Sequence, residues 1–405
     1  MIKVLHTADW HIGKSLYRQP LEQEMSLFFN WLSELLIRES IDVLLISGDI
    51  FDYSNPTHQD TTRYYDFLTK MASLGIKVII TGGNHDSISM LNAPSELLKT
   101  MNIDVFGGVK TDLFDHIIPI FDNEEVVAVV AAIPFLRNKD IKGSANIDAL
   151  MESIADEESA IADIYFKIVT EITLRYPGVP IIAMGHLYMR GAITSDSERD
   201  IHIGTLQGIN KPSLPPQVSY YALGHIHKPQ LVGNDEMCRY SGSPIFLDFS
   251  ERYYTKQVLQ LKIENKTIKD ITSHPIPIFR NVSSHKGDFN SIQLALDTIS
   301  VSDYGLKEYV DLTIEAEQLD SFETSRIVQF IESNLQTDTY IIARYKVISK
   351  TNETHFLENT YVLNELSPMN VFEKFLESKD LDSTQVSALK MCYSEILELI
   401  QASET

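Results

Sequence analysis

Five short stretches of this 405-residue chain combine residue types that bind metal ions. Each follows an apolar run, and together they read Asp9-Trp10-His11, Gly48-Asp49-Ile50-Phe51-Asp52, Gly82-Gly83-Asn84-His85-Asp86, Gly185-His186 and Gly224-His225-Ile226-His227. Carboxylate and amide oxygens with imidazole nitrogens suit Mn²⁺, Fe²⁺ or Zn²⁺, whereas calcium sites use oxygen alone and structural zinc sites favour thiolates. The candidate ligands are too numerous for one ion and fit two ions that share the Asp49 carboxylate: Asp9, His11, Asp49, Asn84, His186, His225 and His227.

The apolar runs before these ligands predict β-strands, and amphipathic segments between them predict helices. The clearest strands are at 3–6, 43–47, 77–81, 180–184 and 220–223, and the helices are at 21–41, 61–72 and 147–174. This alternation is typical of an α/β domain, in which ligands gather beyond the carboxyl ends of the strands. A turn or a surface pair would explain any one motif, but the five in this order predict a metal site.

The overall composition limits the class of protein. A net charge of −22 argues against general electrostatic coating of nucleic acid, so any DNA contact must be local. The two cysteines, Cys238 and Cys392, form no local metal or redox motif and are expected to be reduced and buried. The longest apolar run, from Val126 to Leu136, is too short to span a bilayer, and the first residues lack a secretory signal. We therefore expect a cytoplasmic protein without a membrane segment.

Proline residues around Pro275-Ile276-Pro277-Ile278 predict a domain boundary, since proline interrupts regular strand pairing. We expect a main domain at 1–275 and a small α+β module at 276–350, with strands at 309–314 and 340–347 and a helix at 321–334. The segment 365–405 carries two amphipathic helical patterns. Helices this short are marginal alone, so we expect them to dock on another surface.

At the ligand motifs the chain resembles the calcineurin-like metallophosphoesterases, whose signature combines Asp-x-His, Gly-Asp, Gly-Asn-His-Asp or Glu, Gly-His and Gly-His-x-His. Within that superfamily it is similar to the SbcD family of bacterial nucleases, which act in double-strand-break repair. The matching residues are Thr7-Ala8-Asp9-Trp10-His11-Ile12-Gly13-Lys14, Gly48-Asp49-Ile50-Phe51-Asp52, Gly83-Asn84-His85-Asp86-Ser87, Asp200-Ile201-His202-Ile203-Gly204-Thr205, Tyr221-Ala222-Leu223-Gly224-His225-Ile226-His227 and Tyr240-Ser241-Gly242-Ser243-Pro244.

The resemblance implies a four-layer α-β-β-α sandwich with a small capping domain and C-terminal helices. It also implies two Mn²⁺ ions per chain, with Mg²⁺, Fe²⁺ or Zn²⁺ as alternatives. One ion would be held by Asp9, His11, Asp49 and His227, and the other by Asp49, Asn84, His186 and His225. His85 matches the residue that the family uses near the leaving group, and Asp52 or Asp86 is expected to orient it.

The resemblance further implies two protein partners. Helices near 61–72 and 93–101 fall where these proteins form a homodimer. The apolar residues that would pack at the dimer interface are Tyr65, Phe67, Leu68 and Met71. The segment 365–405 would bind SbcC, the ATPase of the complex. An ordinary intrachain core is the alternative explanation of both apolar stripes.

Basic residues on or just after the ligand-bearing loops are candidate DNA contacts: Lys14, Arg18, Arg63, Arg190 and Lys228. Surface solvation explains each of them equally well. The leading hypothesis is a metal-dependent DNA nuclease, an exonuclease on duplex ends and an endonuclease on single strands or hairpins, which works with SbcC. A phosphodiesterase for nucleotides or other small molecules is one alternative, and an inactive scaffold that tethers DNA ends is another. The extra length beyond Pro275 favours DNA, and the intact ligand set with His85 favours activity.

Overall fold

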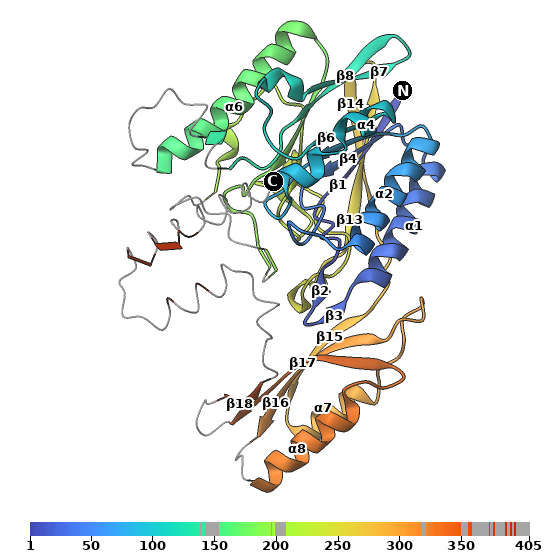
Figure 1. Cartoon of the computed structure of the whole chain (residues 1–405), viewed down its shortest axis with the longest axis vertical. Helices are drawn as coiled ribbons and strands as arrows, with labels where there is room; N and C mark the ends of the chain where they lie inside the picture. Colours follow the sequence, from blue (N-terminus) through green and yellow to red (C-terminus); the bar gives the residue numbers. More distant parts are fainter. Residues whose placement is uncertain are drawn as a thin grey trace.

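The computed structural model describes residues 1–137, 140–141, 154–195, 197–198, 208–316, 321–349 and 355–358, and single positions thereafter: Phe372, Leu376, Gln385, Val386, Leu389, Lys390 and Tyr393. Two six-stranded sheets lie face to face, and a smaller sheet with two helices lies at one end of the molecule (Figure 1). The predicted α/β sandwich is confirmed.

The first sheet carries the first three ligand motifs, and its strand order is β14-β13-β1-β4-β5-β6. Strands β1, β4, β5 and β6 are mutually parallel, whereas β13 runs antiparallel to β1 and to β14. Parallel neighbours bring their carboxyl ends to one edge of a sheet, so three loops converge there. The bounds are β1 Ile2–Thr7, β4 Val43–Ser47, β5 Lys77–Thr81, β6 Ile103–Phe106, β13 Gln257–Glu264 and β14 Thr267–Pro275.

The second sheet carries the last two ligand motifs, in the strand order β11-β12-β10-β9-β8-β7. Strands β8, β9, β10 and β12 are parallel, so β9 and β10 also end at a common edge. The bounds are β7 Ile117–Asp122, β8 Glu125–Ala132, β9 Ile181–His186, β10 Tyr220–Gly224, β11 Gln230–Val232 and β12 Asp235–Tyr240. The five strands predicted to precede ligands are β1, β4, β5, β9 and β10, and all five are confirmed.

An apolar core fills the space between the two sheets, with Val4 and Leu45 from the first sheet and Met184 and Ala222 from the second. Helices α1 (Glu22–Arg38) and α2 (His58–Ser73) pack on the outer face of the first sheet, and α6 (Ile154–Arg175) packs on the outer face of the second (Figure 1). Burial of each leucine or phenylalanine in these cores contributes roughly 1.5–3 kcal/mol to the free energy of folding. The positions of the helices and sheets give the four-layer order α-β-β-α.

The third sheet has the order β15-β16-β17-β18 and is covered by α7 and α8 through a core of its own. The linker residue Arg280 ties this unit to α1: it pairs with Glu24, donates to Gln23 Oε1 at 3.0 Å and lies 4.0 Å from the ring centre of Tyr309. The bounds are β15 Val282–Gly287, α7 Phe289–Leu296, β16 Glu308–Ala316, α8 Ser321–Asn334, β17 Tyr340–Ser349 and β18 His355–Glu358.

Short elements complete the described structure: β2 Ser15–Leu16, β3 Gln19–Pro20, α3 Ile88–Asn92, α4 Ser95–Thr100, and the 3-10 helices η1 Leu113–His116, η2 Lys211–Ser213 and η3 Phe249–Tyr253. Cys238 is buried and forms no disulfide, and Cys392 lies outside the described residues. None of the described helices has the length and apolarity that a membrane crossing requires.

Three predicted segments, 147–174, 365–405 and the apolar stripe of α2, are only partly described or have another role in the structure. The predicted helix at 147–174 is described from Ile154 onward, and most of 365–405 lies outside the described residues, although Phe372 and Tyr393 stack with ring centres 4.0 Å apart. On α2, Phe67, Leu68 and Met71 are buried in the chain's own core, and Tyr65 is partly buried against it. The intrachain alternative for that apolar stripe is therefore the one seen in the structure.

Candidate metal centre

The ligand motifs follow their strands through unusual backbone conformations. Four candidate ligands have positive φ angles although they are not glycine: Asp9 (54°), His11 (47°), Asp49 (49°) and His225 (97°). Such conformations cost of order 1–3 kcal/mol each and persist where the surroundings enforce them, commonly at functional sites. The backbone at these four residues is therefore strained, and this conformation directs their side chains toward the ends of the neighbouring strands.

Two glycines are required by close approach of neighbouring loops. A Cβ atom on Gly83 would overlap the Asp49 carboxylate, and one on Gly224 would overlap the main-chain oxygen of Ser47. The glycines therefore let the loop after β5 meet the loop after β4, and let β10 of the second sheet meet β4 of the first. This contact between sheets brings the five motifs into one site.

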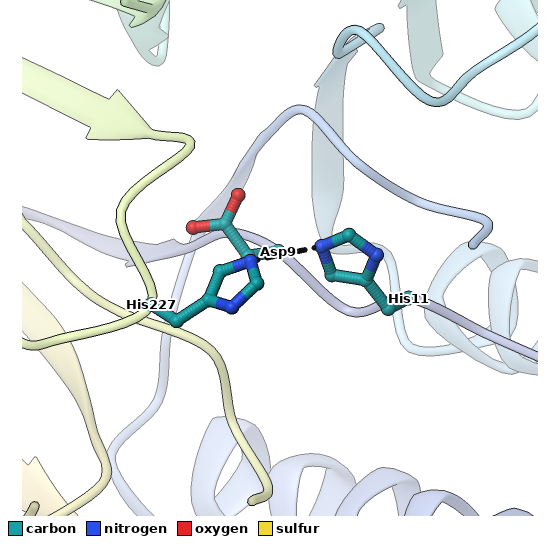
Figure 2. Close-up of side chains that lie close together, drawn as sticks. All are labelled: Asp9, His11 and His227. Atoms are coloured by element: carbon teal, nitrogen blue, oxygen red, sulfur yellow. Dashed lines mark hydrogen bonds between the residues drawn. The ribbon is translucent and has the colours of Figure 1, made fainter. Parts of the chain in front are cut away.

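The buried ligands form two groups whose donor atoms all lie within 4.8 Å of one another inside each group. The first ligand group is Asp9, His11 and His227, drawn in Figure 2, and the second ligand group is Asp49, His186 and His225. Asp49 Oδ2 lies 3.3 Å from His186 Nε2 and 3.5 Å from His11 Nε2, so it faces both groups. Asn84 Oδ1 joins the second group at 2.9 Å from His186 Nε2.

The polar atoms that face one another in the first ligand group fit a bound cation. His11 Nε2 and His227 Nε2 face each other at 3.1 Å, and Asp9 Oδ2 is buried without a hydrogen-bond partner. Burial raises the pKa of Asp9 to about 7, because its charge is removed from water. A divalent cation among these atoms would satisfy all three and restore the ionised carboxylate.

The second ligand group fits a cation for a similar reason. Burial opposes a charge on His186, but the Asp49 carboxylate outweighs that effect and raises the pKa of His186 to about 9. An imidazole in such contact is either protonated or bound to a metal, and the buried His225 beside it is held neutral because burial and His186 lower its pKa. A neutral imidazole is the form that binds metals.

His85 lies at the border of both groups. Its Nδ1 is 2.8 Å from the main-chain oxygen of Asp52, its Nε2 is 4.0 Å from Asp49 Oδ2, and its ring meets that of His11 edge to face with centres 4.7 Å apart. The main-chain N–H of His85 also donates to Asp49 Oδ1 at 3.0 Å. Backbone contacts thus fix both the loop and the ring.

Asp52 and Asp86 have different surroundings, although the sequence predicts that either could orient His85. The Asp52 carboxylate lies 3.0 Å from His11 Nδ1 and 3.2 Å from Lys14 Nζ; burial opposes its ionisation, but Lys14 and His11 lower its pKa. The Asp86 carboxylate accepts hydrogen bonds from the main-chain N–H groups of Ile50, Phe51 and Gly83. Asp86 therefore joins two ligand loops. Asp52 contacts His85 through its main-chain oxygen, and its carboxylate oxygen Oδ1 lies 3.8 Å from His85 Nδ1.

The predicted DNA contacts are scattered. Lys14 faces the site through Asp52, and Arg18 is exposed in the β2–β3 turn. Arg63 pairs with Asp60 and Glu22 on the outer helices, Arg190 lies 3.7 Å from Glu158, and Lys228 lies 5.3 Å from the ring centre of Tyr254. Among these five, Lys14 contacts a residue that supports a ligand, Asp52.

Sequence reasoning missed a buried ion pair behind His227. Glu251 Oε1 lies 3.2 Å from His227 Nδ1, and Glu251 Oε2 lies 2.6 Å from Lys256 Nζ. Burial opposes ionisation of Glu251, yet Lys256 and then His227 lower its pKa below the usual range. No strand-end motif marks Glu251, and the nearest sequence signal is the Tyr240–Pro244 run that contributes to the family resemblance.

Two packed mixed sheets whose loops gather carboxylate, amide and imidazole donors define a metallophosphoesterase. The sequence profile described as calcineurin-like phosphoesterase matches residues 2–229, and the chain belongs to that family, which hydrolyses phosphate esters with divalent metal ions.

Several bacterial relatives share one name. The SbcD component of the nuclease SbcCD from Escherichia coli strain K12 is 30% identical over 404 residues, which cover 98% of each chain. Its namesake in Rhodobacter capsulatus is 32% identical over 75% of this chain and 77% of its own length. In Bacillus subtilis the namesake is 31% identical over 64% of this chain and 65% of its own length. The resemblance to the SbcD family is confirmed.

Proposed function

We propose that this chain is a DNA nuclease that works with two Mn²⁺ ions and an SbcC ATPase partner in the repair of DNA breaks. The observation that carries the proposal is the convergence of seven ligand side chains, delivered by five strand ends of two sheets, around the shared Asp49 carboxylate. The name of the relatives, one component of a two-part nuclease, supports the substrate class and the partner.

The ligands divide between the two ions by position. Asp9, His11 and His227 would hold one ion and His186, His225 and Asn84 the other, with Asp49 shared between them. Such a pair supplies Lewis acidity toward the phosphate and toward an attacking water. Mn²⁺ suits this mixture of oxygen and nitrogen donors, as do Fe²⁺ or Zn²⁺, whereas the alternative Mg²⁺ prefers oxygen ligands alone.

His85 would act as the proton donor to the leaving oxygen. A main-chain oxygen can only accept, so the contact with Asp52 requires a hydrogen on Nδ1 of His85. A second proton on Nε2 then makes the ring an imidazolium, and that nitrogen lies 4.0 Å from Asp49 Oδ2, the carboxylate oxygen shared by the two ligand groups. Transfer of the Nε2 proton to the departing alkoxide leaves a neutral ring in the same orientation, ready to be reprotonated from solvent.

The parts beyond the sandwich support a polymeric substrate. We assign 1–275 to the nuclease domain, 276–350 to a capping domain and 365–405 to an SbcC-binding segment. A homodimer contact near helices α2 and α4 would have to use their outward-facing residues, because Phe67, Leu68 and Met71 are buried in the chain's own core. A small-molecule phosphodiesterase needs none of these additions. Because the chain carries a net charge of −22, the positive charge that DNA requires must come from the ions, from residues at the site such as Lys14, or from the partner.

The test compares hydrolysis of duplex DNA ends with that of a chromogenic phosphodiester, bis(p-nitrophenyl) phosphate, in Mn²⁺ with and without SbcC. We expect wild type to cleave both substrates and His85→Ala to lose roughly 100- to 10,000-fold in DNA cleavage while it still binds both ions. His58→Ala, at an exposed position on α2, is the matched control and should behave as wild type. Cleavage of the small diester without cleavage of DNA, even with SbcC, would reject the DNA assignment, and two bound ions without any hydrolysis would favour the scaffold.

A further inference from the structure

His227 is the last ligand in the sequence, and its two ring nitrogens have different neighbours. Nε2 faces the first ligand group, 3.1 Å from His11 Nε2. Nδ1 points the other way, 3.2 Å from Glu251 Oε1 and 2.5 Å from Ser197 Oγ. What holds Nδ1 therefore decides how Nε2 is presented to a metal ion.

The group behind Nδ1 is a completely buried carboxylate. Glu251 lies on η3 with no exposed surface, and its Oε2 accepts from the main-chain N–H of Leu247 at 3.1 Å and from Lys256 Nζ at 2.6 Å. Lys256 is also buried, and it donates to Ser243 Oγ at 2.6 Å. Each charge is thus balanced and hydrogen-bonded, which is the condition under which buried ions persist in proteins.

This environment selects one tautomer of His227. An ionised carboxylate has no hydrogen to donate, so the contact between Glu251 Oε1 and Nδ1 is favourable only if the proton lies on Nδ1. Ser197 Oγ donates its own hydrogen to Glu251 Oε1 at 2.5 Å, so toward Nδ1 it acts as an acceptor as well. In a neutral ring the lone pair then lies on Nε2, the atom that faces Asp9 and His11. A carboxylate acceptor also makes the opposite nitrogen more basic than a main-chain oxygen would, and hence a stronger ligand.

We propose that Glu251, neutralised by Lys256, is a positioning residue that fixes the orientation and tautomer of His227 and so sets the metal affinity of the first ligand group. This inference rests on the proposed function for the identity of the ligands. The segment between β12 and β13, which follows the five strand-end motifs in the sequence, thereby gains a role in orienting a metal ligand. The second ligand group has no contact with Glu251 among the described residues, so its ion should be insensitive to this position.

The experiment titrates metal-free full-length protein with Mn²⁺ and measures free Mn²⁺ by electron paramagnetic resonance, which gives the number of bound ions and the Kd of each. We expect Glu251→Gln to weaken one ion roughly 10- to 100-fold and to leave the other unchanged. Glu24→Gln is the matched control, because Glu24 is a buried carboxylate paired with Arg280 outside the ligand groups, and both ions should bind it as they bind wild type.

Two further variants separate positioning from folding. Glu251→Gln leaves Lys256 as an uncompensated buried charge, so the double variant Glu251→Gln/Lys256→Met removes both charges and should show the same selective weakening. If neither folds, Glu251→Asp keeps the charge opposite Lys256 but withdraws the carboxylate from Nδ1, and it too should weaken one ion. Wild-type affinity for both ions in every folded variant of this set would overturn the proposal.

The affinity measurement is independent of any substrate. Unchanged metal binding in the Glu251 variants would therefore reject the positioning role alone. Two ions bound to wild type without cleavage of DNA would instead reject the nuclease function and leave the role of Glu251 intact.

Discussion

The two ligand groups differ in what holds their imidazole rings. In the first group, His11 Nδ1 lies 3.0 Å from a carboxylate oxygen of Asp52, and the equivalent atom of His227 lies 3.2 Å from a carboxylate oxygen of Glu251. In the second group, His186 Nδ1 lies 3.1 Å from the main-chain oxygen of Ser47 on β4. Side chains orient both rings of the first group, whereas the main chain of β4 orients His186 of the second.

The two carboxylates that hold the imidazole rings of the first group, Asp52 and Glu251, are each paired with a lysine. Lys14 Nζ lies 3.2 Å from Asp52, and Lys256 Nζ lies 2.6 Å from Glu251. A single substitution can remove a carboxylate from this arrangement, but none can remove the Ser47 main-chain oxygen. The metal affinity of the first group should therefore be adjustable by mutation, and that of the second should depend on the fold.

The largest effect is expected at Asp49, whose carboxylate oxygen faces an imidazole of each group. Asp49→Asn removes the charge shared by His11 and His186, so both ions should be lost or strongly weakened, and phosphodiester hydrolysis should fall by more than about 1,000-fold, equivalent to ~4 kcal/mol. Metal content after dialysis and the rate on a chromogenic diester measure this. Asp66→Asn, at an exposed position on α2, is the control. Retention of one ion at wild-type affinity would show that the groups do not share Asp49.

A smaller and selective effect is expected at Asp52. Asp52→Asn keeps the main-chain oxygen that contacts His85 but removes the carboxylate that holds His11, so the ion of the first group should bind roughly 10- to 100-fold more weakly. The second ion is the internal control in the same Mn²⁺ titration. Equal weakening of both ions would mean that the two groups respond as one unit and that the contrast between them is wrong.

The contrast also explains what could be predicted from the sequence. The ligands and their glycines come directly after apolar strands, so motifs such as Gly48-Asp49 and Gly224-His225 can be recognised locally. The α/β fold can be predicted from the spacing of apolar residues along the strands and helices. The supports of the first group are not local. Glu251 follows His227 by 24 residues, with nothing nearby to mark a buried acid. Strand β15, Val282–Gly287, is also absent from the sequence prediction, because its polar residues show no apolar alternation.

The smallest effect on metal binding is expected beneath the site, where His6 of β1 and Tyr220 of β10 meet across the two sheets. His6 Nδ1 lies 3.1 Å from Tyr220 Oη in the buried core, so Tyr220→Phe should lower the free energy of unfolding by about 1 kcal/mol. If the sheets orient the second group as rigid bodies, this change should leave both Mn²⁺ affinities unaltered. A selective loss of the second ion would instead show that its geometry depends on this one inter-sheet bond.

His6 of this pair also determines in which direction the free energy of unfolding changes with pH. Burial lowers the pKa of His6 to about 3, so between that value and the usual 6.5 the unfolded chain binds a proton that the folded chain does not. Stability should therefore fall as the pH falls, by roughly 2 kcal/mol at pH 5 from this group, and His6→Gln should remove that part of the acid sensitivity in urea unfolding measured at pH 5 and pH 7.5. An unchanged difference between the two pH values would place the acid sensitivity in other groups, the site carboxylates and imidazoles first among them.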